Sequence, residues 1–159
     1  MTPAVVLLED KGVTFGVHEY DRGDGLRDFG REAAEALGLE HDQVFKTLLV
    51  DTEGGDAPRD PVVVVVPVSC MVSMKLVAAA VGAKKAAMCD PAAAERITGY
   101  VVGGISPLGQ RKLLRTVLDE SVELFDTIYV SGGRRGLDIS LAPRDLADLL
   151  DAVVAPITA

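Results

Sequence analysis

The sequence predicts a single α/β domain over residues 1–159, with a mixed, curved central sheet or partial barrel flanked by helices. Segments with helix caps alternate with short apolar runs, without the regular strand–helix–strand period of a parallel sheet. The length of 159 residues is typical of one domain. Hydrophobic residues make up 48% and charged residues 25% of the chain, close to the average for globular proteins.

Helices are predicted where a capping residue precedes apolar residues at helical spacing and a glycine follows them. Thr2 and Pro3 open the first helix, and Gly12 follows it. The other predicted helices are 29–37 closed by Gly38, a segment from Ser73 to Gly82, a segment from Asp90 and Pro91 to near Gly99, and a final segment from Pro143 through Leu150.

Strands are predicted where apolar residues alternate or β-branched residues cluster between turn signals. They are 15–20, 45–51, 62–67, 113–118, 127–131 and 136–141. The connection 52–61 holds two glycines, two prolines and three acidic residues, which indicates an exposed hairpin tip. Residues 132–135 are predicted to form the turn of a second hairpin.

The charge balance argues against tight, unaided binding of RNA. The chain has 16 Lys and Arg and 24 Asp and Glu, which gives a net charge of −8. Autonomous nucleic-acid binders, by contrast, usually carry a basic surface. The basic residues nevertheless gather at 84–85, at 111–115 and at 134–135. Two interpretations stay open: a positive rim that binds one RNA end, and an ordinary solvated surface.

Metal, cofactor and membrane functions have no support in the sequence. The longest purely apolar run is 62–66, far short of the roughly 18 residues of a membrane span, and the N-terminus has no signal-peptide pattern, so a cytoplasmic protein is expected. Cys70 and Cys89 lack the spacing of a zinc site and are expected to be structural. Nucleotide and metal motifs are missing, so we expect neither a cofactor nor a metal.

Lys46 stands out because it interrupts an apolar row. Strand alternation places it on one face with Val44, Leu48 and Val50, and places Thr47 on the other. A buried ammonium is costly, so Lys46 must reach an edge, an acidic group or an anionic ligand such as phosphate.

A glycine-rich segment and a polar hairpin face are two further candidates. Gly103 and Gly104 can bring backbone N–H groups close to a carbonyl oxygen or a phosphate, although such a segment is as often only a turn. In the predicted second hairpin, Ser131 pairs with Gly136, and Asp138 lies diagonally across on the same face, roughly 7 to 8 Å away. This face either lines a small pocket or is solvated.

A Ser-His-Asp triad is hard to assemble from this sequence. The chain has two histidines, His18 on a predicted strand and His41 in an acidic loop, and neither has a partner at ligand spacing. We therefore expect His18 to be structural, and any catalysis to depend on positioning, on backbone donors and on the substrate.

Three motifs occur together in one order, namely FKTLL at 45–49, TGYVVGGISPLGQ at 98–110 and IYVSGGRRGLDI at 128–139. This combination resembles the YbaK family, freestanding relatives of the editing domain inserted in bacterial prolyl-tRNA synthetase. The similarity runs from TPAVVLLE near the N-terminus through the last helix. It implies the editing-domain fold and a deacylase that removes Cys from mischarged Cys-tRNA(Pro). It also implies the mechanism: the substrate thiol attacks its own ester carbonyl, and the cysteine leaves as a cyclic thiolactone.

The resemblance also assigns site residues. It implies that Lys46, Gly103 and Gly104 are catalytic, with the lysine holding the terminal adenosine phosphate or the ester region and the glycines receiving the aminoacyl group. The residues that it implies for substrate binding are Tyr20, Phe29, Thr47, Ile105, Ser106, Pro107, Ser131 and Asp138. No family pattern covers 21–28. The implied partners are the 3′ aminoacyl end of a mischarged tRNA and, transiently, prolyl-tRNA synthetase.

Two alternatives remain at this stage. The same fold can clear Ala or Ser from tRNA, with water as the nucleophile. It can also serve as a non-catalytic binding module with a regulatory role.

Overall fold

The computed structural model describes residues 1–21 and 29–159, so most of the stretch 21–28, which no family pattern covers, lies outside the described residues. The described elements, in chain order, are α1 (Pro3–Lys11), β1 (Phe15–Glu19), α2 (Phe29–Leu37), β2 (Phe45–Glu53), β3 (Val62–Pro67), α3 (Met74–Val81), β4 (Lys85–Met88), α4 (Pro91–Thr98), β5 (Thr116–Asp119), the 3-10 helix η1 (Glu120–Leu124), β6 (Ile128–Arg134), β7 (Leu137–Leu141), α5 (Pro143–Leu150) and β8 (Val153–Ala155).

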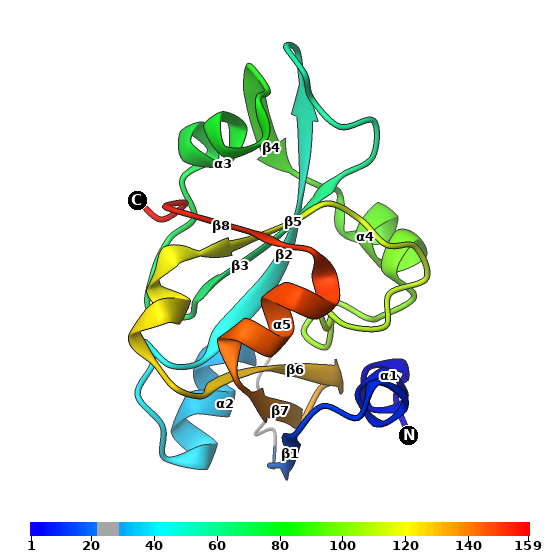
Figure 1. Ribbon diagram of the computed structural model, residues 1–159, viewed down its shortest axis with the longest axis vertical. Coiled ribbons are helices and arrows are strands. Elements are labelled where there is room, and N and C mark those ends of the chain that lie inside the picture. Colours follow the sequence, from blue (N-terminus) through cyan, green and yellow to red (C-terminus); the bar gives the residue numbers. More distant parts are fainter. Residues whose placement is uncertain (22–28) are drawn as a thin grey trace.

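The strands form two sheets that meet at the start of β2. The smaller sheet has the order β1-β7-β6, and the larger one has the order β4-β2-β3-β5-β8. Residue Val44, just before β2, bridges to Tyr129 of β6, so the chain passes from one sheet directly into the other. In Figure 1 the smaller sheet lies at the lower end of the molecule, and β2 runs upward from it. This arrangement confirms the predicted mixed α/β fold.

The larger sheet is mixed and carries core residues on both faces. β3 pairs antiparallel with β2 and parallel with β5, and β5 pairs parallel with β8. Val63 and Val65 belong to one apolar cluster, while Val62, Val64 and Val66 belong to another. Burial on both faces explains the continuous apolar run of β3. None of the described helices is long and apolar enough to cross a membrane.

The capping signals predict the helix starts correctly. The side chains of Thr2, Ser73 and Asp90 accept hydrogen bonds from the backbone N–H groups of Val5, Leu76 and Ala93, respectively. Each of these three helices ends at a glycine in the left-handed conformation. Local sequence therefore sets these boundaries.

The strand predictions need corrections at the edges of the larger sheet. β4 and β8 were not predicted, and β5 begins at Thr116 rather than at 113, where Leu113 is 73% exposed. β4 has the sequence KAAM, which has little intrinsic strand preference, and its conformation follows from pairing with β2. β8 has only three residues and pairs with β5, so its sequence gives almost no periodic signal.

The second hairpin is tighter than predicted. Ser131 pairs directly with Asp138, not with Gly136, because the register shifts between Ser131 and Arg134. The glycines Gly132 and Gly133 lie in this irregular stretch, and Gly133 has a φ of +107°, which a residue with a side chain rarely adopts. The prediction that Ser131 and Asp138 share a face is nevertheless confirmed, since directly opposed residues point the same way.

Candidate active site

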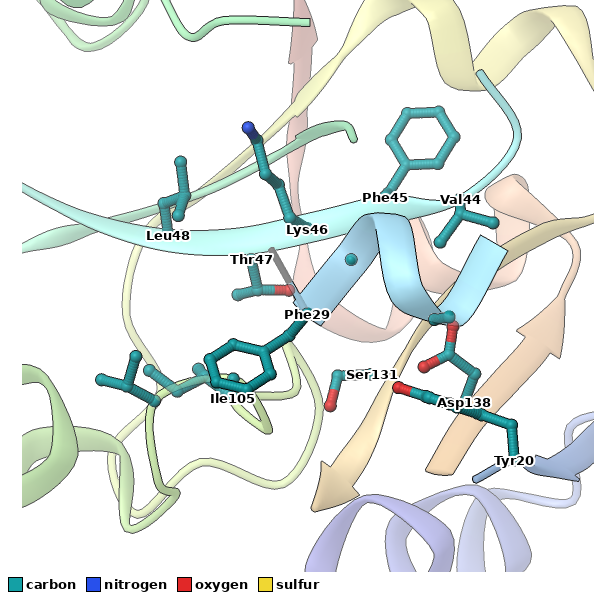
Figure 2. Close-up of a pocket in the computed structure, with 14 residues that line it drawn as sticks. Tyr20, Phe29, Val44, Phe45, Lys46, Thr47, Leu48, Ile105, Ser131 and Asp138 are labelled. Carbon is teal, nitrogen blue, oxygen red and sulfur yellow. The ribbon is translucent and has the colours of Figure 1, made fainter. Parts of the chain in front are cut away.

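A cavity of about 250 Å³ opens where the two sheets and α2 meet. Figure 2 shows its lining, with β2 above and the strands of the smaller sheet below. A hollow near η1 and α5 is larger, about 510 Å³, so size does not single out this cavity. The distinction is chemical, because this cavity collects most of the site residues predicted from the sequence: Tyr20, Phe29, Lys46, Thr47, Gly103, Ile105, Ser131 and Asp138.

Asp138 and Ser131 form the polar floor of the cavity. Asp138 is only 4% exposed, and this burial raises the pKa of its carboxyl to about 7, because a charged group is poorly solvated there. Near neutral pH the carboxyl is therefore present in both its acid and its ionised form. It can donate a hydrogen bond in the first form and accept hydrogen bonds in both.

Thr47 offers a further polar group on the opposite side of the cavity. Its Oγ1 is buried and has no hydrogen-bond partner in the described part of the protein. Figure 2 shows the Thr47 side chain below β2, toward Phe29 and Ser131. Buried hydroxyls are almost always paired in native proteins, so an unpaired one in a cavity indicates a position for water or a ligand.

Lys46 occupies a different part of the site. It is half-buried, and in Figure 2 its side chain extends to the other side of β2 from Thr47, away from Ser131 and Asp138. No acidic side chain among residues 1–21 and 29–159 forms an ion pair with it. The ammonium thus lies apart from the polar floor, in a position that suits an anionic group entering from outside.

Gly103 forms the wall opposite α2. Its φ is +90°, and a Cβ at this position would lie 2.5 Å from the ring of Phe29. Both the backbone conformation and the close approach of the aromatic ring therefore require glycine. The wall and Phe29 fit together as one surface.

Three predicted site residues lie outside the cavity. A Cβ on Gly104 would lie 2.8 Å from the backbone of Arg134, and Ser106 is fully buried, with its hydroxyl accepting a hydrogen bond from the N–H of Leu108. Pro107 borders another hollow. None of the three lines the cavity: Gly104 packs against the backbone of Arg134, and the chain leaves the cavity after Ile105, before Ser106 and Pro107.

Sequence reasoning missed two residues that hold this wall. Arg135 donates from Nε and from one terminal nitrogen to the carbonyl oxygen of Val102, at 2.9 and 2.7 Å, and its guanidinium stacks 4.5 Å from the centre of the Phe29 ring. Glu95 accepts a hydrogen bond from the N–H of Val102 at 2.8 Å. The RR pair in the third motif is the available signal, but the sequence indicates only its positive charge and not its contact with the cavity wall.

Two residues of the basic clusters have acidic partners. Lys112 pairs with Asp60 at 2.7 Å, and Arg134 pairs with Glu19 at 2.9 Å. These contacts reduce the positive charge that the surface offers to an RNA. The two neighbouring arginines therefore have different partners: Arg134 pairs with Glu19 of β1, whereas Arg135 contacts the cavity wall.

The histidines and cysteines do not line the cavity. His18 Nε2 lies 2.8 Å from the hydroxyl of Ser140, and its ring lies 5.1 Å from that of Tyr129, which agrees with the expected structural role. Cys70 and Cys89 are both free thiols. Within the described residues, no three His, Cys, Asp or Glu side chains are grouped in a way that could hold a metal ion.

Comparison with known proteins identifies relatives of this chain. Residues 26–149 match the model of the aminoacyl-tRNA editing domain. The chain is 35% identical, over 99% of its length and 93% of the relative, to an Enterococcus faecalis protein named "Putative Cys-tRNA(Pro)/Cys-tRNA(Cys) deacylase EbsC". It is also 29% identical to the uncharacterized protein YwhH of Bacillus subtilis, over 74% of this chain and 71% of that one.

The fold also matches a solved structure. A protein described as a "putative trans-editing enzyme for prolyl tRNA synthetase" superposes with a TM-score of 0.84, and the match covers 99% of this chain and 95% of the other. The two sequences are 23% identical, so this likeness concerns the fold.

Proposed function

The chain belongs to the aminoacyl-tRNA editing domain family and is an aminoacyl-tRNA deacylase, and we propose that it acts in trans to remove cysteine from mischarged Cys-tRNA(Pro). The observation that carries this proposal is a cavity with several polar groups but no histidine or cysteine among its described lining residues. Such a site suits a reaction whose nucleophile is supplied by the substrate. The volume of about 250 Å³ suits a small aminoacyl group.

The proposed reaction is an intramolecular displacement. The cysteinyl sulfur attacks the carbonyl carbon of its own ester, a carbon–sulfur bond forms, and the bond from that carbon to the ribose oxygen breaks. The thiol proton passes to the ribose oxygen, so the products are a four-membered thiolactone and uncharged tRNA. The enzyme contributes chiefly by holding sulfur and carbonyl close together and by stabilising the oxyanion.

The cavity supplies a group for each part of this substrate. The ammonium of Lys46, outside the polar floor, binds the phosphate of the terminal adenosine. The Gly103 wall receives the ester carbonyl, and Asp138 with Ser131 accepts the hydrogen bonds of the substrate amino group. The unpaired hydroxyl of Thr47 in the cavity orients the reacting group from the side of β2.

The decisive experiment compares Cys-tRNA(Pro) with a tRNA(Pro) that carries S-methylcysteine. The methylated side chain has nearly the same shape but cannot release a thiol proton, so we expect it to persist while Cys-tRNA(Pro) is cleared. Equal clearance of the two, or an aminoacyl-enzyme trapped on Ser131, would overturn the substrate-assisted reaction.

A hydrolytic alternative has one specific observation in its favour. With a pKa near 7, Asp138 is able to accept a proton from a water molecule that attacks the ester. This reaction would clear Ala-tRNA or Ser-tRNA, which carry no thiol. Turnover of these two substrates at the rate of Cys-tRNA(Pro) would favour it.

The partner proposal rests on charge. A net charge of −8 and a partly neutralised basic rim favour weak binding of free tRNA. Weak binding calls for a partner that delivers the tRNA, and the family resemblance supplies the candidate: a transient complex with prolyl-tRNA synthetase, which would pass on the mischarged tRNA in the cytoplasm. Deacylation of Cys-tRNA(Pro) with and without the synthetase tests this.

A further inference from the structure

The residue Val102 is held by charged side chains at both of its backbone polar groups. Its N–H donates to Glu95 Oε2 at 2.8 Å, and its carbonyl oxygen accepts two hydrogen bonds from Arg135, at 2.9 and 2.7 Å. Hydrogen bonds to ionised groups are roughly twice as strong as those between neutral groups. The peptide planes on both sides of Val102 are thus fixed by side chains from α4 and from the β6–β7 turn.

The same arginine connects this backbone to the aromatic side of the cavity. Its guanidinium stacks on the Phe29 ring at 4.5 Å, and that ring in turn abuts Gly103. Arg135, Val102, Gly103 and Phe29 therefore form a closed ring of contacts. A change in the position of Arg135 would shift both walls of the cavity.

The orientation of one donor follows from this arrangement. In a trans peptide the C=O and the next N–H point in opposite directions, so holding the Val102 carbonyl directs the Gly103 N–H away from Arg135. Within residues 1–21 and 29–159, no acceptor pairs with that N–H. A cation on the carbonyl also polarises the peptide and strengthens the N–H as a donor.

We propose that Arg135 and Glu95 are positioning residues that together orient the Val102–Gly103 peptide, so that the Gly103 N–H faces the ester carbonyl oxygen of the substrate. This proposal rests on the proposed deacylase site. Neither side chain has to touch the substrate, and the loss of either lets the peptide rotate. Removing a preorganised oxyanion donor costs about 100- to 1,000-fold in kcat, so partial misorientation is expected to cost about 10- to 100-fold.

Four substitutions separate orientation from charge and from folding. Arg135→Lys keeps the cation but lacks the planar fork that reaches the Val102 carbonyl with two donors. Glu95→Ala removes the acceptor, whereas Glu95→Gln retains an oxygen that accepts from the Val102 N–H. Arg134→Ala is the matched control, because it removes one positive charge from the adjacent position, where the side chain pairs with Glu19.

The measurement is single-turnover and steady-state deacylation, with thermal unfolding to confirm that each variant is folded. We expect Arg135→Lys and Glu95→Ala to lose about 10- to 100-fold in kcat with KM changed less than about twofold. Glu95→Gln should restore kcat to within about threefold of wild type, and Arg134→Ala should keep kcat within about twofold.

Several results would overturn the proposal. Wild-type kcat in Arg135→Lys, equal losses in Arg134→Ala and Arg135→Lys, or no rescue by Glu95→Gln would each show that peptide orientation is not what these residues supply. The series is run on whichever of Cys-, Ala- and Ser-tRNA the wild type clears. If the wild type clears Ala- or Ser-tRNA but not Cys-tRNA(Pro), the substrate assignment is refuted and the positioning test can still be carried out.

Discussion

Replacing Asp138 with Asn is expected to stabilise the protein at high pH while damaging the reaction. Burial raises the pKa of this carboxyl to about 7, from its ordinary value of 3.8. The native state therefore keeps its proton over a pH range in which the unfolded chain has already released it. Consequently the free energy of unfolding falls as pH rises from about 4 to about 7, and the loss is complete above that range. At 1.36 kcal/mol per pH unit it amounts to roughly 4 kcal/mol.

The assay is denaturant unfolding of the wild type and of Asp138→Asn at several pH values between 4 and 8.5. The difference between the two unfolding free energies isolates this carboxyl, since all other groups titrate in both proteins. We expect a small difference near pH 4 that grows in favour of the Asn variant by a few kcal/mol up to pH 8. Asp126→Asn, which removes an exposed carboxyl, serves as the matched control.

Two outcomes would refute this reasoning. A difference that does not change with pH would show that the Asp138 carboxyl titrates alike in the folded and unfolded states. The same pH dependence in Asp126→Asn would show that the effect comes from net charge rather than from burial. If the expected stabilisation is found together with slower deacylation, the buried acid is retained at a cost in stability, as functional groups often are.

The remaining predictions concern the lysine, the supporting glycine, the thiols and the RNA. Lys46→Ala and Lys46→Arg should each lose most deacylase activity at unchanged melting temperature. Ala removes the ammonium, and the planar guanidinium of Arg does not reproduce its compact point charge; a folded variant with near-normal turnover would end this assignment. Gly104→Val should lower the free energy of unfolding by about 1–3 kcal/mol, because its Cβ would meet the Arg134 backbone at 2.8 Å; wild-type stability in denaturant unfolding would contradict that packing. Cys70→Ser and Cys89→Ala should keep full kcat, because neither thiol is the nucleophile. A mass-spectrometric search for an acylated thiol in the wild type tests this assumption independently. Filter binding of free tRNA should be weak and weaken further with salt; tight binding at 0.2 M salt would contradict the charge argument.

The sequence determined the features that depend on neighbours along the chain. The N-caps at Thr2, Ser73 and Asp90 act within one helical turn, so their positions predict where α1, α3 and α4 begin. Alternation in β2 likewise places Lys46 and Thr47 on opposite faces, as Figure 2 shows. The three motifs together identified the family, which the comparisons confirm.

Tertiary structure alone decided how distant segments meet. The register that sets Ser131 opposite Asp138 depends on an irregularity at two glycines, and a pairing rule applied to a regular turn misses it. Arg134 and Arg135 look alike in the sequence, yet one pairs with Glu19 and the other holds the cavity wall. Strand register and side-chain direction at a turn are set by long-range packing, which local propensity does not encode. The residue types that the site needs are therefore readable in the sequence, whereas the fold decides which of them face the cavity.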